Sequence, residues 1–194
     1  MHMRNRWLAT AAVAALGSLA MGASLATCQG YVAHLSGASE VDPVDTAATG
    51  QALFLYSEVS APSDAIPPGV PSGGPLAGRA PTQIDFRLQV SKTEPVAETG
   101  EAGQVIAAHL HCAAAGVNGP IAVTLFDANG TGVATPARLA GALTDASIGT
   151  NDCGIASLAD LVGLLESGNA YVNVHTNAHP GGEIRGQIRA LQGP

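Results

Sequence analysis

The sequence predicts an all-β fold: an antiparallel, Greek-key-like β-sandwich or barrel with one short helix. The 194-residue chain has 24 glycines and 12 prolines but only 4% aromatic and 12% charged residues. This composition is typical of a turn-rich β protein with an aliphatic core. Segments of strand length dominate, and no strand–helix–strand pattern repeats. The length predicts a single domain over residues 28–194.

The strands are predicted from alternation of apolar and polar residues. In Ile84–Val90 every second residue is apolar, which is the period of a half-buried strand. The turn sequence HPGG at 179–182 joins the last two predicted strands into an antiparallel hairpin. The other predicted strands are Gln51–Tyr56, Val105–Cys112, Ile121–Phe126, Ala170–His175 and Glu183–Arg189.

Two segments depart from the strand pattern. Residues 157–167 are predicted to be a helix, because Ser157 can cap it, Asp160 suits its first turn and leucines recur on one face. Residues 60–82 contain six prolines and are predicted to be a long exposed loop. This loop is either a recognition element or plain disordered surface.

Residues 1–27 are predicted to be a signal peptide. Arg4 and Arg6 precede a long run of small and apolar residues, and Ser24–Ala26 fits an A-x-A-like cleavage site. A transmembrane anchor is the alternative, since the run is long enough to span. Cys28 offers the further alternative of lipid attachment, although Thr27 sits where a smaller residue is expected. Export to the periplasm, the cell envelope or the medium follows from the signal peptide.

The charge of the exported chain argues against two classes of partner. Removing the leader leaves six basic residues against fifteen acidic ones, a net charge of −9. Such a surface is unsuited to nucleic acid or to anionic lipid. We expect no membrane span once the leader is removed, and an oligomer is compatible with the sequence.

Cys112 and Cys153 are predicted to form a disulfide, because paired cysteines of an exported chain usually oxidise. A closed loop of about 40 residues would stabilise the fold by roughly 4 kcal/mol on the chain-entropy model. Two free buried thiols are the alternative.

Four of the six histidines lie in two clusters and are the candidate metal ligands. His109 and His111 are two residues apart on a predicted strand, so both imidazoles lie on one face and can converge on one ion. His175 lies on the polar face of a later strand, and His179 lies in the turn that follows. Neutral imidazoles suit copper, with zinc as the alternative, and exclude calcium and magnesium. The competing interpretation is that each cluster is an ordinary solvated polar position.

Three sequence blocks resemble the CHRD domain, which is named after the animal protein chordin. They are HLSGASEVDPVDTAATGQALF at 34–54, HLHCAAAGVNGPIAVTLF at 109–126 and YVNVHTNAHPGGEIRGQIRA at 171–190. The chain departs from that family at Asp42, where proline is usual, and in the length of its proline-rich insertion. The resemblance implies a secreted or envelope β-domain and says little about activity.

The arrangement of the histidines is also similar in layout to the copper-zinc superoxide dismutases. On that analogy His109, His111 and His175, with His179 as a fourth candidate, are copper ligands, and Arg185 is a candidate for steering an anionic substrate such as superoxide. A cross-strand ion pair of Arg185 with Glu183 or Asp85 is the alternative. No second cluster is present at the spacing of a second metal, so one metal is expected.

Two functions are compatible with these features. One is an exported mononuclear copper protein, acting in copper binding and handling or in superoxide dismutase-like redox chemistry. The other is a non-catalytic extracellular module that recognises a protein or glycan. A hydrolase is disfavoured, because neither G-x-S-x-G nor H-E-x-x-H occurs.

Overall fold

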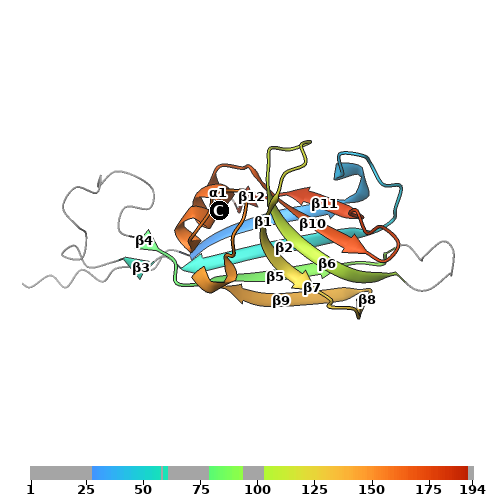
Figure 1. Cartoon of the computed structure of the whole chain (residues 1–194), viewed down its shortest axis with the longest axis horizontal. Helices are drawn as coiled ribbons and strands as arrows, with labels where there is room; N and C mark the ends of the chain where they lie inside the picture. The colour runs from blue at the N-terminus through green and yellow to red at the C-terminus, as the bar shows by residue number, and fades with distance from the viewer. Residues whose placement is uncertain (1–27, 58, 61–78, 94–102, 192–194) are drawn as a thin grey trace, which may run out of the picture.

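The computed structural model describes residues 28–57, 59–60, 79–93 and 103–191 (Figure 1). The predicted signal peptide and most of the predicted loop at 60–82 lie outside the described residues. Within the described part, no helix is long and apolar enough to cross a membrane.

One antiparallel sheet of ten strands dominates the structure. Its main path runs β7-β6-β10-β11-β1-β2-β5-β9, with β8 paired to β6 and β12 paired to β1. The strands are β1 (Cys28–Ser36), β2 (Thr49–Ser57), β5 (Ile84–Val90), β6 (Gln104–Cys112), β7 (Ile121–Asp127), β8 (Val133–Ala134), β9 (Ala137–Leu143), β10 (Ala170–Thr176), β11 (Ile184–Gln187) and β12 (Arg189–Ala190). Two short strands, β3 (Val59–Ser60) and β4 (Arg79–Ala80), pair separately, on either side of residues 61–78.

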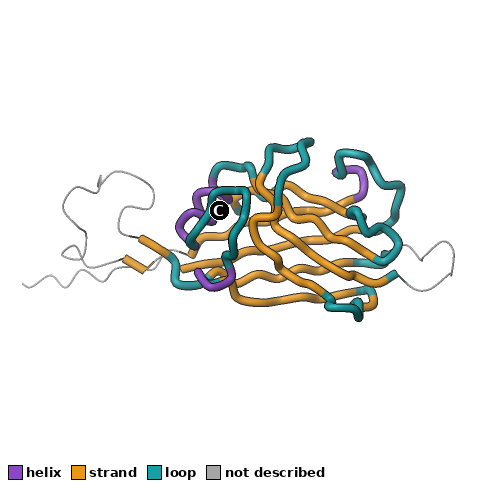
Figure 2. The backbone as a smooth tube through the Cα atoms, viewed as in Figure 1, coloured by secondary structure: helices purple, strands orange, loops and turns teal. Residues whose placement is uncertain are grey.

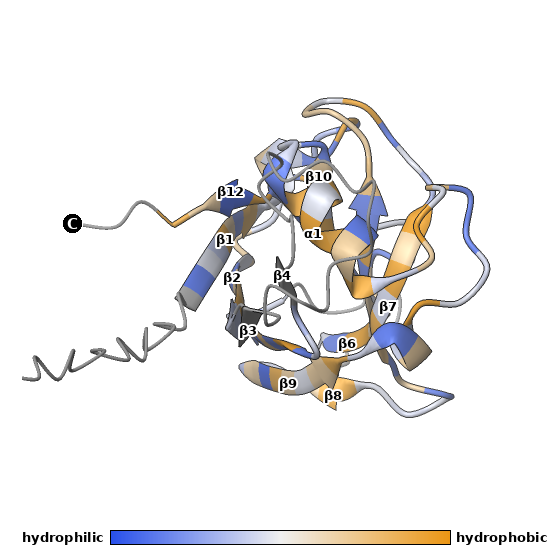
Figure 3. Cartoon of the chain, turned by 90° about the vertical axis from the view of Figure 1, so that its left-hand side faces the viewer, coloured by the Kyte–Doolittle hydropathy of each residue, from blue (hydrophilic) through white to orange (hydrophobic). Residues whose placement is uncertain are grey.

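The sheet curls into a nearly closed barrel, and α1 (Leu158–Glu166) lies at one end of it (Figure 3). Two 3₁₀ turns, η1 (Gly37–Ser39) and η2 (Asp145–Ser147), complete the regular elements of the described part. The all-β prediction with one short helix is confirmed. The predicted helix cap is confirmed too, because the Ser157 side chain accepts a hydrogen bond from the Asp160 backbone N–H.

The barrel interior is filled by the residues that alternation assigned to it. In β5 the four apolar side chains are buried and the three polar ones between them are exposed. The apolar stripe of α1, Leu158, Leu161, Val162 and Leu165, closes the core at its end of the barrel. Each such fully buried side chain contributes about 1.5–3 kcal/mol to folding.

The outer face of β10 and β11 is also covered. The segments 37–48 and 113–120 rise on the same side of the barrel as these strands (Figures 1 and 2). Tyr171, Asn173 and Arg185, which alternation places on the polar face, are 2%, 6% and 1% exposed. These two loops therefore enclose a second, polar interior outside the sheet.

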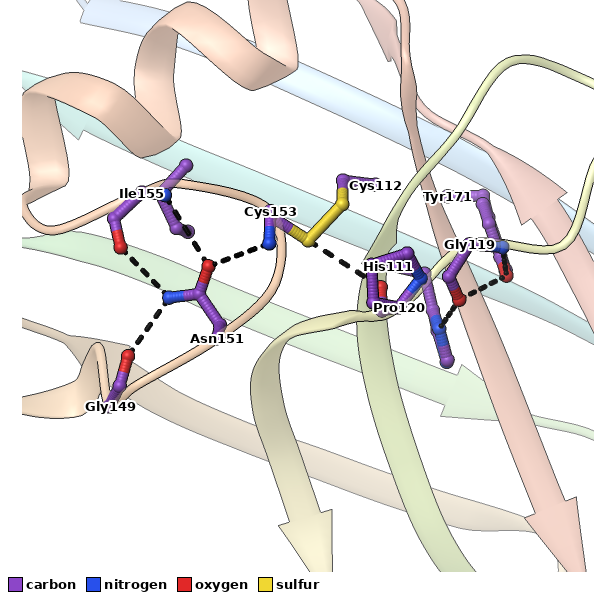
Figure 4. Close-up of a disulfide and its surroundings, with 9 residues drawn as sticks. All are labelled: His111, Cys112, Gly119, Pro120, Gly149, Asn151, Cys153, Ile155 and Tyr171. Atoms are coloured by element: carbon purple, nitrogen blue, oxygen red, sulfur yellow. Dashed lines mark hydrogen bonds between the residues drawn. A yellow bond between two sulfur atoms is a disulfide. The ribbon is translucent and has the colours of Figure 1, made fainter.

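The predicted disulfide between Cys112 and Cys153 is present (Figure 4), and the alternative of two free thiols is wrong. It joins the end of β6 to the segment before α1, and the Cys112 Cα lies 5.9 Å from that of Cys153.

Candidate metal centre

The three strand histidines converge because β6 and β10 are neighbours. Their antiparallel register pairs His109 with Asn173, His111 with Tyr171, and His175 with Ala107. The imidazole of His175 therefore lies diagonally across from that of His109. One ring nitrogen from each of the three histidines lies within 4.8 Å of the others. Between His109 Nδ1 and His175 Nε2 the distance is 3.1 Å.

Backbone carbonyls orient two of the three rings. His111 Nδ1 lies 2.9 Å from the Gly119 carbonyl oxygen, and His175 Nδ1 lies 2.9 Å from that of Pro180. A carbonyl only accepts, so each Nδ1 carries the proton and each Nε2 keeps its lone pair. A carbonyl on the far nitrogen is the usual support of a metal-binding histidine. The lone pairs available to the cluster are thus those of His111 Nε2 and of His175 Nε2, which faces His109 Nδ1.

These residues fit one metal ion. His111 Nε2 is buried, and the described residues offer it no hydrogen-bond partner, a situation that costs about 1–3 kcal/mol unless a ligand fills it. Two nitrogens bound tetrahedrally at about 2.0 Å to one ion lie about 3.3 Å apart, close to the separation of His109 Nδ1 and His175 Nε2. The group includes no carboxylate or thiolate, and an all-imidazole set suits copper or zinc.

The surroundings favour the neutral form of His109 and His111. Burial, helped by the neighbouring His175 and His111, lowers the pKa of His109 to about 4 against the opposing effect of Asp127. Burial also lowers the pKa of His111. Because only neutral imidazole binds a metal, both residues are held in the competent form at neutral pH.

Tyr171 and Arg185 support His111 from the covered face. The Tyr171 ring stacks on the His111 ring with centroids 4.7 Å apart, and the Arg185 Cζ lies 3.4 Å from the Tyr171 centroid. Arg185 also donates to Asn118 Oδ1 at 3.0 Å and to the Val117 carbonyl at 2.8 Å. The guanidinium thus ties down the 113–120 segment that supplies the Gly119 carbonyl.

Arg185 therefore lies in a different environment from the one expected. The outer face of its strand is covered, so the side chain is buried. Its hydrogen bonds go to the 113–120 segment rather than to Glu183 or Asp85, the partners of the ion-pair alternative. Glu183, which is fully buried, instead accepts hydrogen bonds from the Thr46 and Thr176 hydroxyls.

A cavity of about 450 Å³ adjoins the cluster and reaches His111 and His175. Glu40 and Asn173 line it, and the Asn173 amide donates to Glu40 Oε2 at 3.3 Å. Burial raises the pKa of Glu40 above its usual value. A small molecule entering this cavity would meet the cluster on the side of His111 and His175.

The remaining histidine candidate, His179, is not part of the three-histidine group. Its carbonyl accepts hydrogen bonds from the backbone N–H groups of Thr176 and Gly182, which closes the turn after β10. The sequence interpretation missed Gly119, Glu40 and the stacking role of Tyr171. Tyr171 carried a signal, since it shares the polar alternation of His175, whereas nothing near Glu40 marks it.

The comparisons with known proteins place the chain in a family. No curated protein and no solved structure matches it significantly. The family model of the CHRD domain matches residues 31–188, which includes all three histidines of the cluster and both ends of the disulfide. The chain therefore belongs to the CHRD domain family.

Proposed function

We propose that this is an exported protein that binds one copper ion, with zinc as the alternative, through His109 Nδ1, His111 Nε2 and His175 Nε2. The observation that carries the proposal is the buried, unpartnered His111 Nε2 beside two further imidazole nitrogens. Both orienting carbonyls belong to connections between neighbouring strands of the same domain, Gly119 between β6 and β7 and Pro180 between β10 and β11. The acidic charge of the chain, −7 in full, favours the approach of a cation.

Copper is preferred because divalent copper binds nitrogen ligands more strongly than zinc does. The disulfide fits an oxidising compartment, and we propose the periplasm or the cell exterior as the location. In such a place the protein would serve copper binding and handling.

Redox turnover is a second candidate, favoured by the cavity beside His111 and His175. Three protein ligands leave a position for an exogenous ligand, and bound copper would supply one-electron chemistry such as superoxide dismutation. Arg185 does not line this cavity, so we assign it the positioning of the 113–120 segment rather than the steering of superoxide. Glu40, Asp42 and Asn173 are among the polar groups that an entering molecule would meet.

The test is a calorimetric titration of metal-free protein with Cu(II) and with Zn(II). The Cu(II)-loaded protein is then examined by electron paramagnetic resonance. We expect one ion per chain and a spectrum of nitrogen ligation. We expect metal affinity to fall by more than about a hundredfold in each of His109→Asn, His111→Asn and His175→Asn. This loss exceeds the usual effect of removing a residue that only supports a metal ligand. His179→Asn is the matched control and should bind normally.

Absence of tight copper or zinc binding by the folded protein would refute the metal proposal. The remaining candidate function would then be an extracellular module that recognises a protein or glycan. If copper binds, comparing superoxide removal by the loaded and metal-free protein tests the second candidate separately.

A further inference from the structure

A second cavity, of about 430 Å³, lies between β1, β11, β12 and the 113–120 segment. It is distinct from the cavity beside the histidine cluster, and Arg185 is among its lining residues. The side chains that matter for its chemistry are those of His34, Ser39, Arg185, Gln187 and Arg189.

The charge of this cavity is opposite to that of the chain. Six lysine and arginine residues belong to the described part, and two of them, Arg185 and Arg189, line the cavity. No carboxylate lines it. The cavity beside the histidines, in contrast, is lined by Glu40 and Asp42. A cationic hollow in a chain of net charge −7 selects for negative ligands.

Arg185 has neutral hydrogen-bond partners. It is 1% exposed, and its hydrogen bonds go to Asn118 Oδ1 and to the carbonyls of Ala114 and Val117. These bonds use three of the five N–H groups of a guanidinium. Glu40 attracts the guanidinium through a Coulombic interaction without a hydrogen bond to it, and a buried charge without an opposite charge in contact is costly. An anion in the adjacent cavity would offset that cost.

Gln187 adds a requirement for a hydrogen-bond donor. Its amide nitrogen donates to the Ala113 carbonyl at 3.0 Å and to the Gly168 carbonyl at 2.7 Å. Both N–H groups of the side-chain amide are therefore used. Exchanging the amide nitrogen and oxygen would place the oxygen against two carbonyl oxygens, so their assignment is fixed. Gln187 Oε1 is buried, with no hydrogen-bond partner among the described residues. A hydroxyl group on the ligand would satisfy this oxygen.

We propose that this cavity binds the carboxylate or sulfate group of a hydroxyl-bearing ligand. Arg189, on the exposed rim, and Arg185, at the base, supply the positive charge. Gln187 Oε1 accepts a hydrogen bond from the hydroxyl group. The binding does not require the metal, because none of the three clustered histidines lines the cavity.

The experiment is calorimetric titration of the full chain with sodium sulfate, acetate and glucuronate at constant ionic strength. Wild type is compared with Arg189→Gln and with Arg138→Gln, an equal charge change at an exposed arginine of β9. We expect at least one oxyanion to bind, about tenfold more weakly to Arg189→Gln, which loses a charge-assisted hydrogen bond, and normally to Arg138→Gln. Glucuronate should bind more tightly than acetate, which lacks a hydroxyl group. If sulfate binds and neither acetate nor glucuronate does, the group that the cavity recognises is a sulfate rather than a carboxylate.

Two results would overturn the proposal: no binding by wild type, or the same affinity for the two arginine variants. Thermal unfolding of Arg189→Gln checks that it folds. The histidine resonances give a second measurement, because ligand should shift those of His34 and leave those of His109 and His175 in place. Since the metal-free protein is used throughout, failure here would not bear on copper binding, and failure of copper binding would not bear on this cavity.

Discussion

The ring of Tyr171 lies nearly parallel to the imidazole of His111, with an angle of 5° between the two planes. Because β10 lies between β6 and β11, Tyr171 stands between His111 on one neighbouring strand and Arg185 on the other. The Tyr171 hydroxyl also accepts a hydrogen bond from the Gly119 backbone N–H at 3.1 Å. One aromatic side chain thus connects a proposed metal ligand, the loop that orients it and the arginine that holds the loop.

Arg185→Lys should weaken metal binding although the charge is kept. A lysine ammonium cannot reproduce the planar fork that bonds Asn118 and Val117 and stacks on Tyr171. We expect copper affinity to fall about 10–100-fold, which is the usual effect of losing a residue that holds a metal ligand in place. The free energy of unfolding should fall by about 1–3 kcal/mol. Copper titration and urea unfolding measure the two effects, with Arg138→Lys as control. A folded Arg185→Lys protein of full copper affinity would contradict the positioning role.

Gly119→Ala should act on the same histidine through the backbone. A Cβ at residue 119 would collide with the Cys112 carbonyl oxygen and would lie 2.8 Å from the Ala113 Cβ. The Gly119 carbonyl would then move away from His111 Nδ1, and we expect about a tenfold loss of metal affinity, measured by copper titration.

Gly116→Ala is the control within the same loop. Gly116 has φ 77°, and a Cβ added to this residue would meet nothing within 4 Å. This substitution should cost about 1–2 kcal/mol of backbone strain and leave the metal affinity unchanged. Equal copper affinities for the two alanine variants would show that the Gly119 carbonyl does not position His111.

Replacing both Cys112 and Cys153 by serine should destabilise the fold. The disulfide closes a loop with a sequence separation of 41, and its removal should lower the free energy of unfolding by roughly 4 kcal/mol on the chain-entropy model. Urea unfolding of the oxidised wild type and the double variant measures the difference. Wild type reduced before unfolding should match the variant, and an unchanged midpoint in both would refute a stabilising role.

Alternation predicts a strand well when its apolar residues are large. Ile84–Val90 coincides with β5 at both ends. β9 was missed, because alanine and glycine replace larger apolar side chains there and Gly141 packs against the Phe86 ring instead. β1 was also missed, although Tyr31, Ala33 and Leu35 alternate along it and are buried.

The candidate site was predictable in part for a related reason. The two-residue spacing of His109 and His111 places both rings on one face, and a period-two pattern is sufficient to find it. Which loops cover that face depends on contacts between distant segments, such as Asn173 with Glu40 and Arg185 with Val117. Alternation therefore assigned Arg185 to an outer surface that the fold covers.

The metal-free protein should lose stability as the pH falls below neutrality, and His109 should account for much of the loss. Burial and the neighbouring histidines lower its pKa from 6.5 to about 4 in the folded chain. Between these values the unfolded chain binds a proton that the folded chain does not, so the free energy of unfolding decreases as the pH falls through this window. The full shift would correspond to about 3 kcal/mol, and solvent screening of this partly exposed ring lowers the stability effect below that value. Urea unfolding at about pH 7, 5.5 and 4 should show a smaller decrease in the free energy of unfolding for His109→Gln than for wild type, because glutamine does not titrate.

The carboxylates titrate in both proteins, so their contributions cancel in the comparison. Equal decreases in the free energy of unfolding would mean that the fold does not hold His109 neutral.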